Sequence, residues 1–398
     1  MLKKTLISLA LASSVVATSS AAVNVFSWND GKSSLSTSGN FRFAFQSVDT
    51  TSERGATYNK TSRNTWNMRS RVMFSLKQYV TDNLEAGAFL RLTHTFMSRH
   101  DYSLTWNYAN RSYGAKTYSS SHAKNAIKPD RFYTYLDSKS LGRLTVALST
   151  GDFITGQGAA DVRDFGTSTF YLSNQARAIT NAYLKNYQDR LVRYDSPNVA
   201  ESVPLSFSAS YGDMRSNQKV GSETKRRYDT EVSGAVMYQL GSLGRVQFLA
   251  AKKQVYANYT TKYATEGYQL GADLRPTGAL RVRAEVGTAH EASATAYTSY
   301  KDVGVDLSYA LGDFTPYGGL LYLNKQIKYK DASTATQATH QYEVYVGTSY
   351  SLAKKVANAF NFTLFVEANH VYTDYYKNYS NRNGDHAYGF AGGLIVTW

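Results

Sequence analysis

Three features that bear on the fold are absent from the sequence or rare in it. It has no cysteine, only 5 prolines and no long uninterrupted apolar run. Without cysteine, neither disulfides nor thiolate metal sites can form. A membrane-spanning helix needs about 18 consecutive apolar residues, so this chain has no candidate for one. Because proline interrupts the hydrogen bonds of a sheet, its scarcity permits long strands.

The N-terminus has the pattern of a cleaved secretory signal. Lys3 and Lys4 precede a short apolar run over residues 6–16, and the small residues at 20–22 follow. We expect a signal peptide over residues 1–22, because the run is too short for the alternative, a membrane anchor. Cleavage would lower the formal charge from +14 to +12 and leave residues 23–398, which we expect to form one domain.

Apolar and polar residues alternate in 16 stretches of the remaining chain. In residues 41–46, for example, phenylalanine occupies every second position, with Arg, Ala and Gln between. A period of two places the two kinds of residue on opposite faces of a strand. The expected strands lie within residues 35–48, 65–79, 84–97, 131–137, 143–150, 189–195, 205–211, 228–240, 246–250, 270–274, 280–286, 303–311, 314–325, 342–350, 360–367 and 388–398.

The chemistry of the two faces indicates the fold class. The apolar faces carry almost no charge, whereas the opposite faces carry Arg, Asp, Glu, Lys, Ser and Thr. An exported soluble sandwich, the alternative, would bury its apolar face. In lipid that face points outward, and the strands must close into a barrel so that every backbone group is paired. With 33 tyrosines for the lipid–water boundary, short turns at one end and long polar connections such as 99–129 at the other, the pattern predicts an all-β transmembrane antiparallel β-barrel of 16 strands.

Residues 151–188 are the longest interval without the strand rhythm. Leu172, Ala176, Ile179 and Tyr183 follow helical spacing, so we expect a short helix over residues 174–186. Because the strands on both sides form the wall, we expect this segment to fold into the barrel as a constriction loop.

Arginines cluster on the polar faces of the first six expected strands. Several arginines stacked inside a barrel would repel one another unless they faced water, anions or carboxylates. A pore with positive and negative walls creates a transverse field that orients polar solutes. The candidate residues of the basic wall are Arg42, Arg69, Arg71, Arg91, Arg131 and Arg193.

Several segments resemble the general trimeric porins of Gram-negative bacteria. Residues 67–77 (NMRSRVMFSLK) resemble the second strand of that family. Residues 130–133 and 142–146 resemble its fourth and fifth strands, and residues 389–398 resemble its closing strand. Residues 191–198 (LVRYDSPN) resemble the sixth strand and its turn, and are the most specific of these matches. Met73 and Ser75 stand where the family has glycine, and residues 149–151 depart from its fifth strand.

The resemblance implies a homotrimer in which the third loop narrows each pore. Acidic residues on that loop would face a ladder of arginines, to which Arg71, Arg131 and Arg193 correspond by motif. The sequence Val-Arg-Asp-Phe-Gly at 162–166 resembles the acidic motif of the loop, so Asp164, with Asp161 as its neighbour, is the expected acidic partner.

The expected function is a water-filled channel for passive diffusion of ions and small hydrophilic solutes, with a mild anion preference because the chain is strongly basic. Its expected surroundings are outer-membrane lipid and lipopolysaccharide. No cofactor, metal or nucleic-acid partner is expected.

Three other functions remain open. A sugar-specific channel could use Tyr133 and Phe165 as an aromatic track, and the long polar connections could serve as an adhesin or phage receptor. An outer-membrane enzyme is less supported, because no nucleophile elbow or metalloprotease motif occurs and the seven histidines are scattered. His94, on an apolar strand face, is expected at an aromatic girdle or a subunit contact.

Overall fold

The computed structural model describes residues 23–29, 31–54, 57–107, 112–124, 126–149, 153–154, 185–186, 190–199, 203–220, 223–257, 261–331, 334, 336–356, 360–377 and 381–398. The expected signal peptide lies outside these residues, as does most of 151–188. Among the described residues, no helix is long and apolar enough to cross a membrane.

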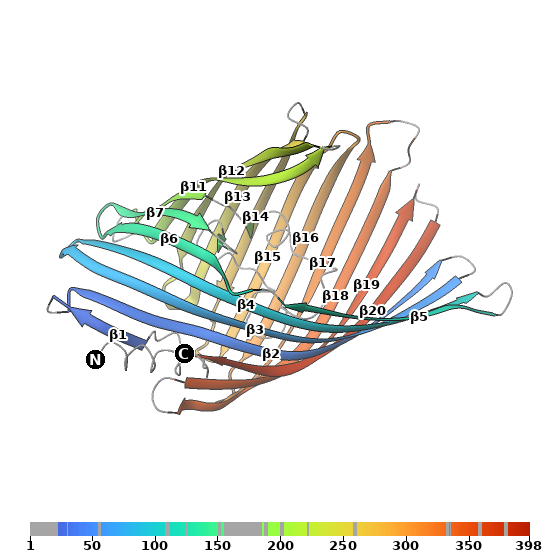
Figure 1. The fold of residues 1–398 in the computed structure, drawn as a ribbon, viewed down its shortest axis with the longest axis horizontal. Helices are drawn as coiled ribbons and strands as arrows, with labels where there is room; N and C mark the ends of the chain where they lie inside the picture. The colour runs from blue at the N-terminus through green and yellow to red at the C-terminus, as the bar shows by residue number, and fades with distance from the viewer. Residues whose placement is uncertain are drawn as a thin grey trace.

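Nearly all of the described chain forms strands (Figure 1). They are β1 (Val23–Trp28), β2 (Ser33–Arg54), β3 (Thr57–Thr81), β4 (Leu84–Asn107), β5 (Ser112–Lys124), β6 (Lys128–Ser138), β7 (Gly142–Ser149), β8 (Phe153–Ile154), β9 (Lys185–Asn186), β10 (Arg190–Asp195), β11 (Leu205–Val220), β12 (Glu223–Gln239), β13 (Gly244–Ala257), β14 (Thr261–Leu274), β15 (Leu280–Ala292), β16 (Ala296–Tyr309), β17 (Phe314–Tyr329), β18 (Gln337–Val356), β19 (Phe360–Lys377) and β20 (Asn381–Thr397).

The main sheet closes on itself as an antiparallel barrel. Of its 18 strands, all but β1 and β5 form a ring of 16, which confirms the predicted fold class and strand count. The ring closes where β2 pairs with β20, and Gly39 and Trp398 exchange two backbone hydrogen bonds there, of 2.8 and 3.0 Å. β7 pairs directly with β10, so the wall is continuous although residues 150–189 separate the two strands in sequence.

Strands β1 and β5 are not members of the ring, and in the described part of the chain each pairs with one ring strand only. β1 pairs with the first residues of β2, where no strand was expected. β5 pairs with β4 from Phe96 to Asn107, after β6 has paired with the earlier part of β4. Residues 99–129, expected as a long polar connection, therefore form mostly strand, in which the last part of β4 pairs with β3 on one side and with β5 on the other. Tyr102, Leu104 and Trp106 alternate with polar residues there, but this short pattern was not predicted to continue the strand.

The polar connections at this end are also shorter than expected. Only 55–56 separate β2 from β3, and only 221–222 separate β11 from β12. The strands are correspondingly longer than the ~10 residues that cross a membrane, and β3 has 25. We call this the far end, and the end with turns 82–83, 139–141 and 310–313 the turn end.

Exposure of the side chains confirms the inside-out pattern. On β18, Val344 and Val346 are 50% and 63% exposed, whereas Glu343 and Tyr345, which alternate with them, are 2% and 4% exposed. Tyr342 and Tyr350 bound this apolar stretch. Their eight-residue separation spans about 27 Å of strand. At a tilt of about 40° this gives about 21 Å of height, close to the ~25 Å apolar band of such barrels.

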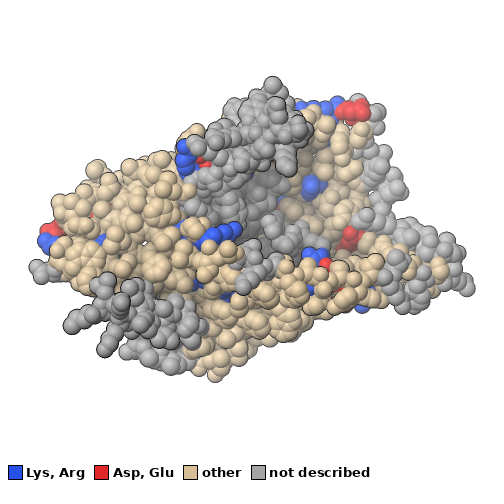
Figure 2. All heavy atoms as spheres, viewed as in Figure 1, with Lys and Arg blue, Asp and Glu red and all other residues tan. Residues whose placement is uncertain are grey.

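Charged side chains are sparse on the outer wall. In Figure 2, lysine, arginine, aspartate and glutamate gather at the ends of the wall and around its hollow, and most of the remaining described surface is neither basic nor acidic. An apolar belt with charged ends suits a wall surrounded by lipid.

Tyrosines on the inner face pack across glycines of the neighbouring strand. Tyr135 lies opposite Gly87, and a Cβ at Gly87 would come within 2.3 Å of the tyrosine ring. Tyr345 lies in the same way opposite Gly319, whose added Cβ would come within 2.6 Å of the hydroxyl. Glycine is needed at these positions because any side chain would displace the ring.

The short strands β8 and β9 pair with each other near the two ends of the expected constriction loop, with Phe153 opposite Asn186. The helix expected over residues 174–186 lies outside the described residues, apart from the two residues of β9.

Candidate pore lining

Five of the six candidate arginines form one group on the inner face of the wall. Arg42 lies opposite Arg69 across β2 and β3, and Arg91 lies opposite Arg131 across β4 and β6. Arg71 lies between these pairs, two residues from Arg69 on the same face. We call these five residues the arginine band. Arg69 and Arg91 are each 5% exposed, so part of the positive charge lies against the wall itself.

Two irregularities in the ladder flank Arg131. On the β4 side, Arg91 pairs with Arg131 and Leu92 with Pro129, which leaves residue 130 as an extra residue. On the β7 side, the register shifts again between Phe132 and Tyr133. Bulges bend a strand and re-aim its side chains, and they are frequent beside functional sites. Sequence alternation alone could not locate them.

Arg193 lies apart from the arginine band. It is 3% exposed, and its guanidinium donates to both carboxylate oxygens of Asp195 at 2.6–2.9 Å. Across the ladder it faces Thr145 of β7. The structure therefore places this candidate in an ion pair nearer the turn end.

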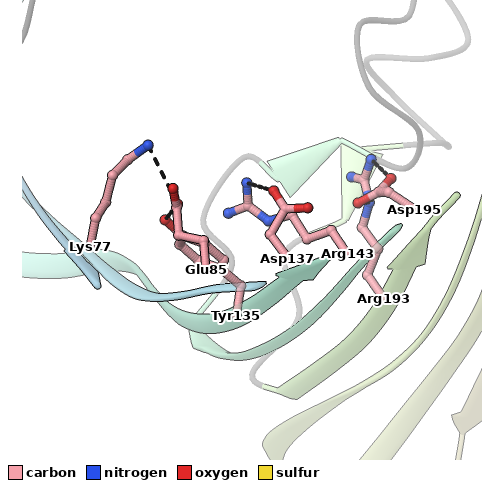
Figure 3. Close-up of polar contacts among 7 residues, drawn as sticks. All are labelled: Lys77, Glu85, Tyr135, Asp137, Arg143, Arg193 and Asp195. Atoms are coloured by element: carbon pink, nitrogen blue, oxygen red, sulfur yellow. Dashed lines mark hydrogen bonds and ion pairs between the residues drawn. The ribbon is translucent and has the colours of Figure 1, made fainter. Parts of the chain in front are cut away.

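A polar ladder joins neighbouring strands at the turn end (Figure 3). Lys77 Nζ lies 3.5 Å from Glu85 Oε1, and the Tyr135 hydroxyl donates to the same oxygen at 2.6 Å. The Arg143 guanidinium lies 3.7 Å from the centre of the Tyr135 ring and 4.0 Å from Asp137. Opposite charges alternate along these contacts, so this rim is nearly balanced in charge.

Buried carboxylates line the inner face from β15 to β19. β15 is eight strands from β4 in the ring of 16, and β16 is eight strands from β6, so Glu285, Asp302 and Asp306 lie opposite the Arg91–Arg131 pair. Glu343 on β18 and Glu367 on β19 lie further round the ring, towards β2. Each of the five is at most 3% exposed, and we call them the acidic wall: Glu285, Asp302, Asp306, Glu343 and Glu367.

Hydrogen bonds hold the acidic wall in place. The Tyr345 hydroxyl donates to Asp306 at 2.5 Å, and Arg283 lies 3.6 Å from the same carboxylate. Gln269 donates to Glu285 at 2.7 Å, and Asn369 donates to Glu343 at 2.8 Å. Partners of this kind offset the cost of removing a carboxylate from water.

The acidic wall was missed as a group by sequence reasoning. Its members alternate with apolar residues like the arginines, and that was the available signal. The strand register and the closure of the ring were needed to group them on one stretch of the wall and to place Glu285, Asp302 and Asp306 opposite the Arg91–Arg131 pair. Asp161 and Asp164, the acidic residues expected on the constriction loop, lie outside the described residues.

Metal ligands do not gather within the described part of the chain, where no group of three or more His, Cys, Asp or Glu residues is placed to hold a metal ion. His94 lies on the outer face of β4, opposite Ser70 of β3.

A closed barrel with an apolar outer wall and a charged, hydrogen-bonded interior defines a pore-forming membrane protein of the outer-membrane type. The chain belongs to the Gram-negative porin family, whose model matches residues 5–386. As a porin, it lies in the outer membrane and forms a water-filled channel for passive diffusion of ions and small hydrophilic solutes. Family and fold point to a channel rather than an enzyme.

Solved structures of low sequence identity share the fold. The anion-selective porin from Comamonas acidovorans is 12% identical with a TM-score of 0.56, over 92% of this chain and 100% of that one. The outer-membrane channel DcaP of Acinetobacter baumannii is 11% identical with a TM-score of 0.55, over 93% and 99%. OmpT of Vibrio cholerae is 11% identical with a TM-score of 0.53, over 92% and 98%. Comparison with curated protein sequences finds no match.

Proposed function

We propose that the arginine band is the basic wall of the pore constriction and that it gives the channel a mild preference for anions. The observation that carries the proposal is the direct pairing of Arg91 with Arg131 beside a bulge, with Arg71, Arg69 and Arg42 continuing the group. Adjacent guanidinium groups raise the local concentration of anions, most strongly where the pore is narrow.

The acidic wall adds a transverse field to this preference. Positive charge on β4 and β6 and negative charge on the opposite strands β15 and β16 would orient dipolar solutes across the pore and disfavour apolar ones. A similar channel, the Comamonas acidovorans porin, is described as anion-selective, which supports the direction of the preference. We further propose that Asp161 and Asp164 face the band from the loop at 151–188, and that Arg193 belongs to a separate ion pair.

Reversal potentials across a planar bilayer test the selectivity. In a gradient of potassium chloride, the reversal potential of the wild-type channel is expected to have the sign of a membrane more permeable to chloride than to potassium. This preference for chloride is expected to weaken as ionic strength rises. A potential of the opposite sign, set by potassium, would contradict the proposal.

We also propose that the protein is a homotrimer that contacts its copies through the outer face of β3 and β4. His94 lies on this outer face opposite Ser70, and Leu92 and Phe96 flank it on the same face, so this patch offers apolar side chains and one imidazole ring to a second copy. Stepped closure of single channels in threes would support the trimer, and single-step closure would oppose it.

The remaining outer surface is proposed to contact outer-membrane lipid and lipopolysaccharide, and no catalytic function is proposed. The apolar belt between Tyr342 and Tyr350 supports the lipid contact. Extraction into detergent followed by analysis of retained lipid would test it.

A further inference from the structure

The inner wall carries an aromatic pair next to the arginine band. Phe89 and Tyr133 are register partners across β4 and β6, and their rings are stacked with centroids 5.0 Å apart and planes 17° apart. Both side chains are only partly buried. Partly exposed aromatic carbon facing a water-filled pore is unfavourable by itself, because apolar area is best removed from water. A solute with an apolar ring could cover it.

The neighbouring tyrosine is already occupied by contacts within the wall. Tyr135 is 6% exposed, packs across Gly87, donates to Glu85 and lies under the Arg143 guanidinium. Its role is structural. Tyr133 has the same parity but is only partly buried, so Phe89 and Tyr133 expose more aromatic surface than Tyr135 does.

The arginine pair lies one inward-facing position further along the same two strands. Phe89 precedes Arg91 by two residues, and Tyr133 follows Arg131 by two residues. Two residues of a strand span about 6.7 Å. A carboxylate held by a guanidinium would therefore place a ring attached to it over the aromatic pair. The bulge beside Arg131 and the register shift after Phe132 set the local direction of β6 at this point.

A second guanidinium lies near the aromatic pair. The Arg143 Cζ atom lies 5.9 Å from the centre of the Tyr133 ring. The rings are thus flanked by positive charge from Arg131 along the strand and from Arg143 on β7. An electron-rich or anionic ring suits such a surface better than a neutral aliphatic one, because guanidinium groups stack on π-systems and pair with carboxylates.

We propose that Phe89, Tyr133 and Arg131 form a solute subsite for aromatic carboxylates inside the pore, with the buried Arg91 adding positive charge behind it. The carboxylate would pair with the Arg131 guanidinium, and the flat ring would stack on Phe89 and Tyr133. This inference rests on the channel function and specifies a solute class for it. The subsite is weak, as transport requires, because a solute that binds tightly cannot leave the channel.

Benzoate, cyclohexanecarboxylate and benzyl alcohol are suitable probes. In single-channel recordings, benzoate is expected to reduce potassium chloride current in a saturable way. Cyclohexanecarboxylate has the same charge without a flat ring, and benzyl alcohol has the ring without charge. Both are expected to need about 5- to 10-fold higher concentrations for equal block. Equal block by benzoate and cyclohexanecarboxylate would overturn the proposal.

The double variant F89L/Y133L separates this inference from the anion preference. It keeps apolar side chains of moderate size and all arginines. It is expected to weaken benzoate block about 5- to 10-fold while the reversal potential for potassium chloride stays at the wild-type value. The control F43L removes an aromatic ring from the outer face, where Phe43 is 40% exposed, and should change neither reading.

A conservative variant covers the case in which F89L/Y133L yields no channels. F89Y keeps an aromatic ring at the inner position and should retain benzoate block within about twofold of wild type. Loss of anion preference with intact benzoate block would refute the proposed selectivity and leave the subsite standing. Intact anion preference with benzoate block unchanged in F89L/Y133L would refute the subsite alone.

Discussion

Arg91 lies directly opposite Arg131 across the ladder of β4 and β6, on the inner face of the barrel. Like charges directly opposite each other destabilise a sheet. The barrel nevertheless places them at a bulge beside a third arginine, Arg71, and eight strands away from the acidic residues of β15 and β16. This direct pairing of two arginines within the wall is the main reason for assigning it a role in the pore.

Removing the charge of this pair should reduce the anion preference. In the double variant R91Q/R131Q we expect the chloride-to-potassium permeability ratio to fall about two- to threefold, because two positive charges leave the lumen. Reversal potentials in a salt gradient measure the ratio. The control R63Q removes one arginine that pairs with Asp101 at 3.0 Å, where β4 pairs with β5 rather than with β6. A ratio that falls equally in R63Q would place the selectivity elsewhere.

Y345F should destabilise the barrel. The variant keeps the ring over Gly319 and removes the hydroxyl that donates to Asp306, a carboxylate that is 0% exposed. Loss of a hydrogen bond to a buried charged group costs about 1.5–3 kcal/mol. Urea unfolding in lipid vesicles measures the change. Y342F removes a hydroxyl from the outer girdle, where Tyr342 is 46% exposed, and should have a much smaller effect.

G87A should displace Tyr135 from the inner wall. The added Cβ would come within 2.3 Å of the ring, which cannot move without losing its hydrogen bond to Glu85. We expect a loss of about 1–3 kcal/mol, as for other overpacked sites. Thermal unfolding followed by gel mobility measures it. In G278A the new Cβ meets no heavy atom within 4 Å, so this turn variant should unfold like wild type. Equal stability of G87A and G278A would show that Tyr135 tolerates displacement.

V346R should destabilise the barrel in lipid. Val346 is 63% exposed and lies midway between Tyr342 and Tyr350 on the outer face. A lipid-facing arginine at the bilayer midplane costs about 2–4 kcal/mol, and much less near an interface. Q326R at the far end of β17 is the matched control. Unfolding in vesicles should show a larger loss of stability in V346R than in Q326R. An equal loss would mean that the apolar belt lies elsewhere along the strands.

Much of the fold could be predicted from short stretches. Residues 41–46 and 342–350 already show which face is apolar, because alternation along a strand is a local property. The 16 strands of the ring overlap the 16 stretches predicted from alternation. Two strands were missed. Val23–Trp28 pairs with β2, and Ser112–Lys124, which is rich in Ser, Tyr and Lys, pairs with β4, because the backbone can pair whatever the side chains are.

The candidate site was less predictable. The inward parity of Arg42, Arg69, Arg71 and Arg91 follows from alternation alone, whereas Arg131 opens its strand beside a bulge. Their grouping depends on the register, in which a shift of one residue turns every side chain to the other face. The separation of Arg193, held by Asp195 at 2.6 Å, also depends on the register between β7 and β10.

The sequence by itself determined that this protein is a lipid-facing barrel with a polar interior. The absence of an apolar helix, the period of two and the placement of charge are all local features, and lipid leaves a closed sheet as the remaining solution. Only the tertiary structure decided which charges meet. The direct pairing of β7 with β10, the closure of β2 on β20 and the bulge beside Arg131 join residues far apart in the chain. Together with the register of β4 and β6, they put Arg91 and Arg131 beside Phe89 and Tyr133 and across the barrel from the acidic residues of β15 and β16.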